Sequence, residues 1–192
     1  STEEDTLTKN SYKSGKVVRV SPPAYSNISN ICRAFANNRL INEVIDTFYG
    51  VPNNKFMQIF AYYDTLMRDK EWVDGITHSA ALHFDPYQSL KFATYLTDTS
   101  EENGMTRIIP GSQEEGKYFR NNLKSSMWEG KEILNCHKPF EQSSYSEKDA
   151  IWPSVKAGTL VIFDTDCWHA GGEIKVPGLE RKCIIVHSRK SS

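Results

Sequence analysis

The spacing of the apolar residues changes once along the chain, and this change limits the possible folds more than any other feature. Over residues 27–49 the apolar side chains recur at helical spacing, with Asn37-Asn38 able to divide the stretch into two helices and Gly50 as a stop signal. Beyond Gly50 they fall in short runs rich in aromatic and β-branched residues, which is typical of strands. Helices followed by many short strands favour a β-barrel or jelly roll with helices packed outside.

Turn residues separate the predicted strands. A first strand at residues 16–20 ends at Ser21-Pro22-Pro23, and the others are predicted at 55–63, 90–97, 105–109, 159–163 and 182–187. Residues 117–136 have a weak helical pattern, and 138–153 are predicted to form a long polar loop. We therefore predict a mainly β fold with flanking helices, a double-stranded β-helix of the jelly-roll or cupin type. We expect one domain over residues 1–192, with a frayed start over residues 1–16.

Length and charge narrow the class of protein. A chain of 192 residues can bury about 70% of its unfolded surface, and 39% hydrophobic residues can supply the core. Its 23 basic and 24 acidic residues nearly cancel, so no net positive charge attracts nucleic acid or anionic lipid. No apolar run reaches the length of about 18 residues that a membrane helix needs. We expect a protein that binds neither nucleic acid nor membranes, as a monomer or weak homodimer.

The cysteines indicate a compartment. The chain has four dispersed cysteines, Cys32, Cys136, Cys167 and Cys183, with no CxxC pair. This pattern predicts free thiols in a reducing compartment, and the polar first 16 residues contain no signal peptide, so we expect a cytoplasmic protein. Cys167, directly before Trp168-His169, is also a minority candidate for a thiolate nucleophile.

The tripeptide His83-Phe84-Asp85 places two potential metal ligands two positions apart. In an extended segment, residues i and i+2 point to the same side, so the imidazole and the carboxylate can face one metal ion. His169, just after the strand predicted at residues 159–163, is the candidate for the third ligand. Two histidines and one carboxylate form the facial triad of non-heme Fe(II) oxygenases, which leaves positions open for a bidentate oxoacid and for O2.

The tripeptide alone is weak evidence, and its context adds weight. With five histidines and ten aspartates in the chain, a His-x-Asp arises by chance in about one of four such sequences, and a surface loop is the alternative interpretation. His83 precedes one predicted strand, however, and His169 follows another. Arg181 lies twelve residues beyond His169, and its guanidinium suits the distal carboxylate of a dicarboxylate cosubstrate. An ordinary surface arginine is the alternative at that position.

The order of these motifs resembles the phytanoyl-CoA dioxygenase family, which includes ectoine hydroxylases and related halogenases. The matching stretches are His83-Phe84-Asp85, residues 90–98 (LKFATYLTD), 103–112 (NGMTRIIPGS) and 157–163 (AGTLVIF), then His169 and Arg181. The stretch at 103–112 carries no ligand, yet it is the most telling because it recurs in the family. The resemblance covers roughly residues 55–187, which is most of the chain.

The resemblance implies an Fe(II)- and 2-oxoglutarate-dependent dioxygenase that uses O2 and acts on a small-molecule substrate. His83, Asp85 and His169 would be the iron ligands and the catalytic centre, and Arg181 would bind the distal carboxylate of 2-oxoglutarate. Family halogenases have Gly or Ala at the position of Asp85. The resemblance therefore favours hydroxylation of an unactivated C–H bond in a small or intermediate metabolite, with release of succinate and CO2.

Further residues are candidates through the same resemblance or through a shared strand face. Gln58 is similar to a polar cosubstrate contact of ectoine hydroxylases, and Tyr62 shares its strand face. Lys91 stands where some family members have a small polar cosubstrate contact, so no role is assigned to it. His187 shares a strand face with Arg181 and is a candidate for lining the same cavity.

Two other functions stay open, and the chain departs from the family in two respects, its length and Gln113, which follows the Pro-Gly-Ser turn where the family often has His or Arg. One of these functions is a cupin-like metal enzyme that does not use 2-oxoglutarate, such as an isomerase or hydrolase. The other is a jelly-roll binding module. Family chains are usually longer, and their N-terminal region and loop insertions help to form the substrate pocket. Those parts are short or missing in this sequence.

Overall fold

A computed structural model gives the structure of residues 8–12, 15–20, 34–35, 37–51, 55–65, 81–122, 138–172, 174–176 and 178–190. It also describes the side chains of these residues, except those of residues 8–12, 15–20 and 55–65 and of Lys138, Pro139 and Lys190. Its strands are β1 (Thr8–Tyr12), β2 (Gly15–Val20), β3 (Lys55–Thr65), β4 (Ser89–Tyr95), β5 (Arg107–Ile108), β6 (Leu160–Asp164), β7 (His169–Ala170) and β8 (Glu180–Lys190). Its helices are α2 (Arg39–Tyr49), α3 (Gln113–Asn122) and the short 3-10 helices η4 (Lys138–Gln142) and η5 (Glu147–Asp149).

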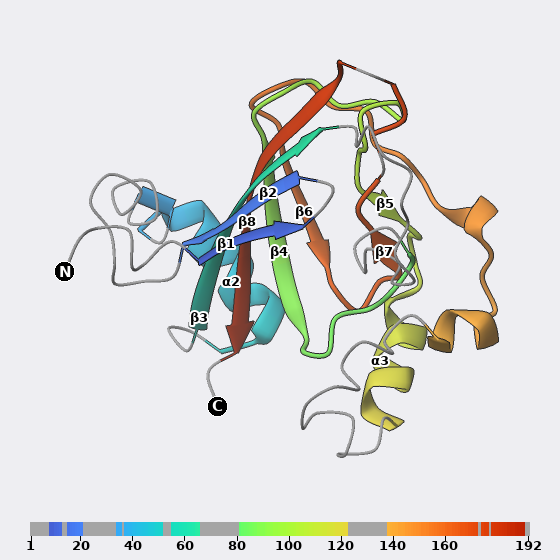
Figure 1. Cartoon of the computed structure of the whole chain (residues 1–192). Helices are drawn as coiled ribbons and strands as arrows, with labels where there is room; N and C mark the ends of the chain where they lie inside the picture. The colour runs from blue at the N-terminus through green and yellow to red at the C-terminus, as the bar shows by residue number, and fades with distance from the viewer. Residues whose placement is uncertain are drawn as a thin grey trace.

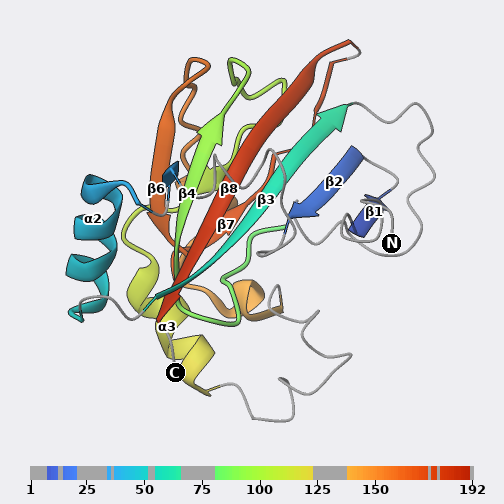
Figure 2. The ribbon, with the colours of Figure 1, turned by 90° about the vertical axis from the view of Figure 1, so that its left-hand side faces the viewer.

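Six strands form one large antiparallel sheet. Their order is β1-β2-β3-β8-β4-β6, and the strands can be followed side by side in Figure 2. The long β8 lies between β3 and β4, so the C-terminal strand is central and ties the two halves of the sheet together. The sequence predicted β3, β4, β6 and β8 because each is a run of branched and aromatic residues.

Helix α2 packs on one face of the large sheet (Figure 1). It begins where the Asn38 side chain accepts a hydrogen bond from the Ile41 amide at 3.2 Å, and it ends at Gly50, which has a φ of 66°. Its buried Ile45 packs with Phe92 of β4 in the core cluster of that face. The predicted break at Asn37-Asn38 is therefore confirmed, whereas residues 27–33 lie outside the described part of the chain.

The opposite, inner face of the large sheet meets a small sheet. Strands β5 and β7 pair with each other, and Ile108 of β5 packs against Phe163 of β6. Isolated bridges extend this small sheet on both sides, through His83 opposite His169 and Ile151 opposite Ile108. Two facing antiparallel sheets with helices outside confirm the predicted double-stranded β-helix. None of the described helices combines the length and the apolar character needed to cross a membrane.

Three local predictions differ from the structure. Residues 8–12, within the segment expected to be frayed, form strand β1, because backbone pairing with β2 requires no apolar pattern. The weak helix predicted at 117–136 is α3 at Gln113–Asn122, and residues 123–137 lie outside the described part. The predicted polar loop at 138–153 contains the two 3-10 helices, whose turns need no periodic apolar residues.

Candidate metal centre

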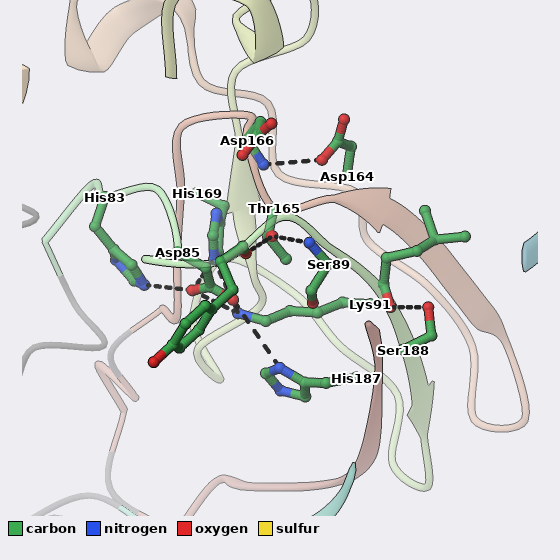
Figure 3. A network of polar contacts seen from close by, with 12 residues as sticks. His83, Asp85, Ser89, Lys91, Asp164, Thr165, Asp166, His169, His187 and Ser188 are labelled. Atoms are coloured by element: carbon green, nitrogen blue, oxygen red, sulfur yellow. Dashed lines mark hydrogen bonds and ion pairs between the residues drawn. The ribbon is translucent and has the colours of Figure 1, made fainter. Parts of the chain in front are cut away.

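The three predicted ligands converge where the small sheet meets β4. His83 and His169 lie opposite each other in a β-bridge that is closed by two backbone hydrogen bonds of 3.0 and 2.9 Å. The amide of Asp85 donates to the Thr165 carbonyl at 3.1 Å, which ties Asp85 to the loop before β7. Ligand atoms from His83, Asp85 and His169 all lie within 4.8 Å of one another (Figure 3), so these side chains could hold one metal ion.

Both imidazoles present the same nitrogen to the centre. Nδ1 of His83 lies 2.8 Å from the Ala81 carbonyl, and Nδ1 of His169 lies 2.8 Å from the Cys167 carbonyl. A carbonyl only accepts, so each Nδ1 carries the proton and each Nε2 keeps its lone pair. The two Nε2 atoms lie 3.8 and 3.4 Å from Oδ1 of Asp85. This is the tautomer that a metal-binding histidine requires, with the other ring nitrogen fixed by a backbone carbonyl.

The charges of the triad also suit a cation. Burial, followed by the charge of His169, holds the pKa of His83 well below its ordinary value, and burial followed by Lys91 lowers the pKa of His169. Burial alone would raise the pKa of Asp85, but Lys91 and the histidines outweigh it and hold this pKa well below its usual range. At neutral pH the centre therefore consists of two neutral imidazoles and one carboxylate, the state in which these groups bind metals.

Lys91 of β4 also reaches this centre. Its Nζ lies 2.9 Å from Oδ2 and 3.2 Å from Oδ1 of Asp85, and it donates to Nε2 of His169 at 3.0 Å. The sequence contained one indication of this contact, because Lys91 is the only charged residue in strand β4. A lysine that is buried in a sheet needs an acidic partner.

Two residues of β8 lie on the same inner face. His187 pairs in register with Lys91, and its Nδ1 lies 4.0 Å from Oδ2 of Asp85. Burial, followed by Lys91, lowers the pKa of His187 to about 3, so a neutral imidazole lines the centre. Arg181 is buried nearer the start of the strand, and its Nη1 donates to the Gly172 carbonyl at 3.3 Å. His187 therefore lines the candidate metal centre. Arg181 lies on the same inner face of the sheet, and its contact with 2-oxoglutarate stays a prediction.

The sequence profile of the phytanoyl-CoA dioxygenase (PhyH) family matches residues 13–183, nearly the whole chain. The chain belongs to the phytanoyl-CoA dioxygenase family. This family consists of Fe(II)/2-oxoglutarate oxygenases, so the resemblance seen in the sequence motifs is confirmed. Family membership favours an oxygenase over the cupin-like enzyme without 2-oxoglutarate and over the binding module. No curated protein sequence matches the chain significantly.

Solved structures with the same fold include SnoN, EvdO2 and EctD. The epimerase SnoN from nogalamycin biosynthesis, in complex with Fe3+, alpha ketoglutarate and nogalamycin RO, has a TM-score of 0.60 at 14% identity, covering 96% of this chain and 68% of SnoN. EvdO2 from Micromonospora carbonacea var. aurantiaca, complexed with 2-oxoglutarate, gives 0.56 at 11%, covering 98% and 78%. EctD from S. alaskensis gives 0.57 at 17%, covering 97% and 61%. At these identities the likeness shows the fold, and the chain spans only part of each relative.

The recurring stretch at 103–112 of the phytanoyl-CoA dioxygenase family has a structural task here. The buried hydroxyl of Ser112 donates to the Ile109 carbonyl at 2.7 Å and accepts from the Trp168 amide at 2.9 Å. Gly111 turns the chain before it with a φ of 84°, which favours glycine. This turn therefore holds the residue next to His169, which explains how a motif without a ligand supports the centre.

Helix α3 supports the same loop, a contact that the sequence patterns did not indicate. Arg120 donates from Nε and Nη2 to the two carboxylate oxygens of Asp166, at 2.9 and 2.8 Å. Gly116 lies so close that an added Cβ would stand 1.9 Å from the Asp166 carbonyl oxygen. The loop that leads into His169 is thus fixed from one side by α3 and from the other by Ser112.

The remaining predicted site residues have different outcomes. In the β3–β8 register Gln58 lies opposite His187 and Tyr62 opposite Cys183, but the side chains of β3 are outside the described part, so their cosubstrate roles stay predictions. Burial, followed by the charge of Asp164, raises the pKa of the Cys167 thiol to about 11. A thiol with this pKa is protonated at neutral pH, which argues against the nucleophile interpretation.

Proposed function

We propose that this chain is an Fe(II)- and 2-oxoglutarate-dependent dioxygenase that hydroxylates an unactivated C–H bond of a small or intermediate metabolite. The observation that carries the proposal is the convergence of His83, Asp85 and His169, with both Nε2 atoms within 3.8 Å of Oδ1 of Asp85. Membership of an Fe(II)/2-oxoglutarate oxygenase family supports the choice of metal and cosubstrate.

The residues fit an iron ion. Two imidazole nitrogens and one carboxylate oxygen form the donor set that non-heme Fe(II) oxygenases use. His169 is almost fully buried, and His83 and Asp85 are partly buried, so the centre is shielded while a side remains for ligands to approach. A carboxylate at position 85 is the residue that distinguishes hydroxylases from the related halogenases in the family resemblance. SnoN was solved with Fe3+ and alpha ketoglutarate, and EvdO2 with 2-oxoglutarate, which agrees with this assignment.

The side chains divide the work of binding and orientation. Iron and 2-oxoglutarate, when bound, supply the oxidation of the substrate by O2, with release of succinate and CO2. His83, Asp85 and His169 would hold the iron, and the Arg181 guanidinium would bind the distal carboxylate of 2-oxoglutarate. Neutral His187 adds a polar group to the wall of the centre without repelling a metal ion.

Gln58 and Tyr62 complete the proposed cosubstrate contacts. Both lie on β3 opposite the inner-face residues of β8, and their roles rest on the resemblance.

We further propose that residues 1–192 act as one oxygenase domain, monomeric or weakly dimeric. The dispersed cysteines support a cytoplasmic location.

Turnover of the cosubstrate tests this function. Purified protein with Fe(II), ascorbate and 2-oxoglutarate should release succinate slowly without substrate, and a panel of small metabolites should contain compounds that raise this rate. His83→Ala and Asp85→Ala should each abolish the succinate signal because each removes one of three ligands. Succinate formation that persists in either variant would remove that residue from the proposed centre. Absence of succinate from the wild-type protein in every mixture would count against the oxygenase itself.

A further inference from the structure

The Lys91 ammonium lies among the proposed iron ligands themselves. Its Nζ is within 3.2 Å of both carboxylate oxygens of Asp85 and of Nε2 of His169. Figure 3 shows the side chain extending from β4 to Asp85, with His169 and His187 close by. The Lys91 side chain is only 10% exposed, so this is an inward placement and not a surface contact.

Lys91 donates hydrogen bonds to the same ligand atoms of His169 and Asp85 that a metal ion would need. An ammonium has three donors and no acceptor, so its contact with His169 occupies the Nε2 lone pair. Its contacts with Asp85 use one lone pair on each carboxylate oxygen. Among the described residues, Lys91 is the only lysine or arginine in an ion pair with Asp85. It therefore supplies the positive charge that a buried carboxylate requires when no metal ion is bound.

We infer that Lys91 is a built-in counter-ion that takes the metal's place in the metal-free protein and must leave before a metal ion can bind. The inference rests on the proposed metal centre and deepens it. A metal ion and an ammonium cannot share the same lone pairs, and two cations at this separation repel each other. Metal binding is consequently a competition between the incoming ion and Lys91 for Asp85 and His169.

The Lys91 ammonium has a second attractive contact on the same inner face. Lys91 lies opposite Phe163 in the β4–β6 register, and its Nζ is 5.9 Å from the centroid of that ring. The face of an aromatic ring attracts an ammonium, so rotation about the four-carbon stem can carry the charge from Asp85 towards Phe163. The lysine then remains inside the domain while the triad is released.

The competition determines by how much Lys91 weakens the binding of a metal ion. The apparent affinity for metal is reduced by the fraction of molecules in which Lys91 has already left. If the contacts of Lys91 have the strength of one charge-assisted hydrogen bond, that fraction is roughly one in 10 to one in 150. Lys91→Met keeps a long side chain and removes the charge, so this variant should bind metal about 10- to 150-fold more tightly.

Titration with Mn(II) alone, followed by calorimetry, tests the inference without any turnover. The variants are Lys91→Met and Lys91→Gln, of which the second keeps a hydrogen-bond donor for Asp85 without a charge. Lys156→Met is the matched control, since Lys156 also pairs with an aspartate, Asp98, at 2.7 Å but lies exposed. We expect tighter Mn(II) binding by both Lys91 variants, with a smaller gain for Lys91→Gln, and wild-type affinity for Lys156→Met.

Thermal unfolding gives a second, independent measurement. Without metal, Lys91→Met should unfold at a lower temperature than the wild type, because it leaves the Asp85 carboxylate without its cation. Saturating Mn(II) should then raise its melting temperature more than it raises that of the wild type, since the ion replaces the lost charge.

The outcomes separate this inference from the function on which it rests. Equal or weaker Mn(II) binding by the Lys91 variants, with normal binding by the wild type, would overturn the competition and leave the metal centre intact. Absence of Mn(II) binding by every variant and by the wild type would instead refute the metal centre. Failure of both Lys91 variants to fold even in saturating Mn(II) would also overturn the inference, because the metal should substitute for the ammonium.

Discussion

The ion pair between Arg120 and Asp166 offers a direct test of how the centre is supported. The pair is doubly hydrogen-bonded, at 2.9 and 2.8 Å, and the Asp166 side chain is 1% exposed. Arg120→Met keeps much of the volume and removes the guanidinium, so a buried carboxylate loses its partner. Breaking such a pair costs about 3–5 kcal/mol, and we expect the lower end because the arginine side chain is 17% exposed. For a domain of this size, a loss of about 3 kcal/mol corresponds to a fall in Tm of roughly 6–12 °C.

Urea denaturation and thermal unfolding measure this loss. The double variant Arg120→Met/Asp166→Asn should recover much of the stability, because it removes the buried charge along with its partner. Lys156→Met serves as the control, since it breaks an aspartate pair of similar length at the exposed surface, and we expect a far smaller change. Mn(II) binding by Arg120→Met should also weaken, because the loop that carries His169 is less firmly held.

Two results would refute this reasoning. If Arg120→Met loses no more stability than Lys156→Met, the ion pair does not anchor the loop. If Arg120→Met is destabilised as expected but binds Mn(II) like the wild type, α3 stabilises the domain without positioning His169.

Two further predictions concern separate parts of the molecule. Arg181→Ala should weaken 2-oxoglutarate binding by roughly 10- to 150-fold, the value of one charge-assisted hydrogen bond, and unchanged affinity in a calorimetric titration would reject its assignment. Burial alone would raise the pKa of Glu115, but hydrogen bonds led by that from Ser143 outweigh it and lower this pKa. Glu115 therefore contributes stability above its ordinary pKa that is lost as the pH falls through the lowered value, and Glu115→Gln should remove this part of the acid-induced loss of stability.

The fold and the candidate triad could be predicted because side-chain periodicity and the family resemblance indicate the same residues. A strand places residues two apart on the same side, so His83 and Asp85 indicate a shared ligand face before any tertiary contact is known. The change from helical to strand-like spacing after Gly50 likewise follows from side-chain periodicity. The position of His169 just after a predicted strand then made it the candidate for the third ligand.

The contacts that hold the triad in place could not be predicted in this way. Lys91 meets Asp85 because of the pairing of β4 with its neighbours, and Arg120 meets Asp166 because of the docking of α3, which sequence spacing does not encode. Buried charges inside apolar segments were the available signal for Lys91. For Arg120, on a weakly patterned helix, the sequence offered no comparable signal.

The importance of the motif at residues 103–112 could be predicted from the sequence, but its task could not. Its recurrence marked it as important, but its task is visible only in three dimensions. The Asn103 side chain accepts from the Ser100 amide and donates to the Asp98 carbonyl, both at 2.6 Å, while Ser112 bonds the Trp168 amide. The motif thus shapes the turns around the centre, which explains why no ligand chemistry could be inferred for it.

The most direct test of the central claim is the visible absorption of the protein mixed anaerobically with Fe(II) and 2-oxoglutarate. Chelation of an oxoacid by iron at a facial triad gives a weak charge-transfer band. We predict this band for the wild-type protein, its loss in Asp85→Ala, and its weakening in Arg181→Ala at limiting 2-oxoglutarate. A wild-type protein that shows no band at saturating Fe(II) and 2-oxoglutarate would contradict the assignment of His83, Asp85 and His169 as an iron centre for 2-oxoglutarate.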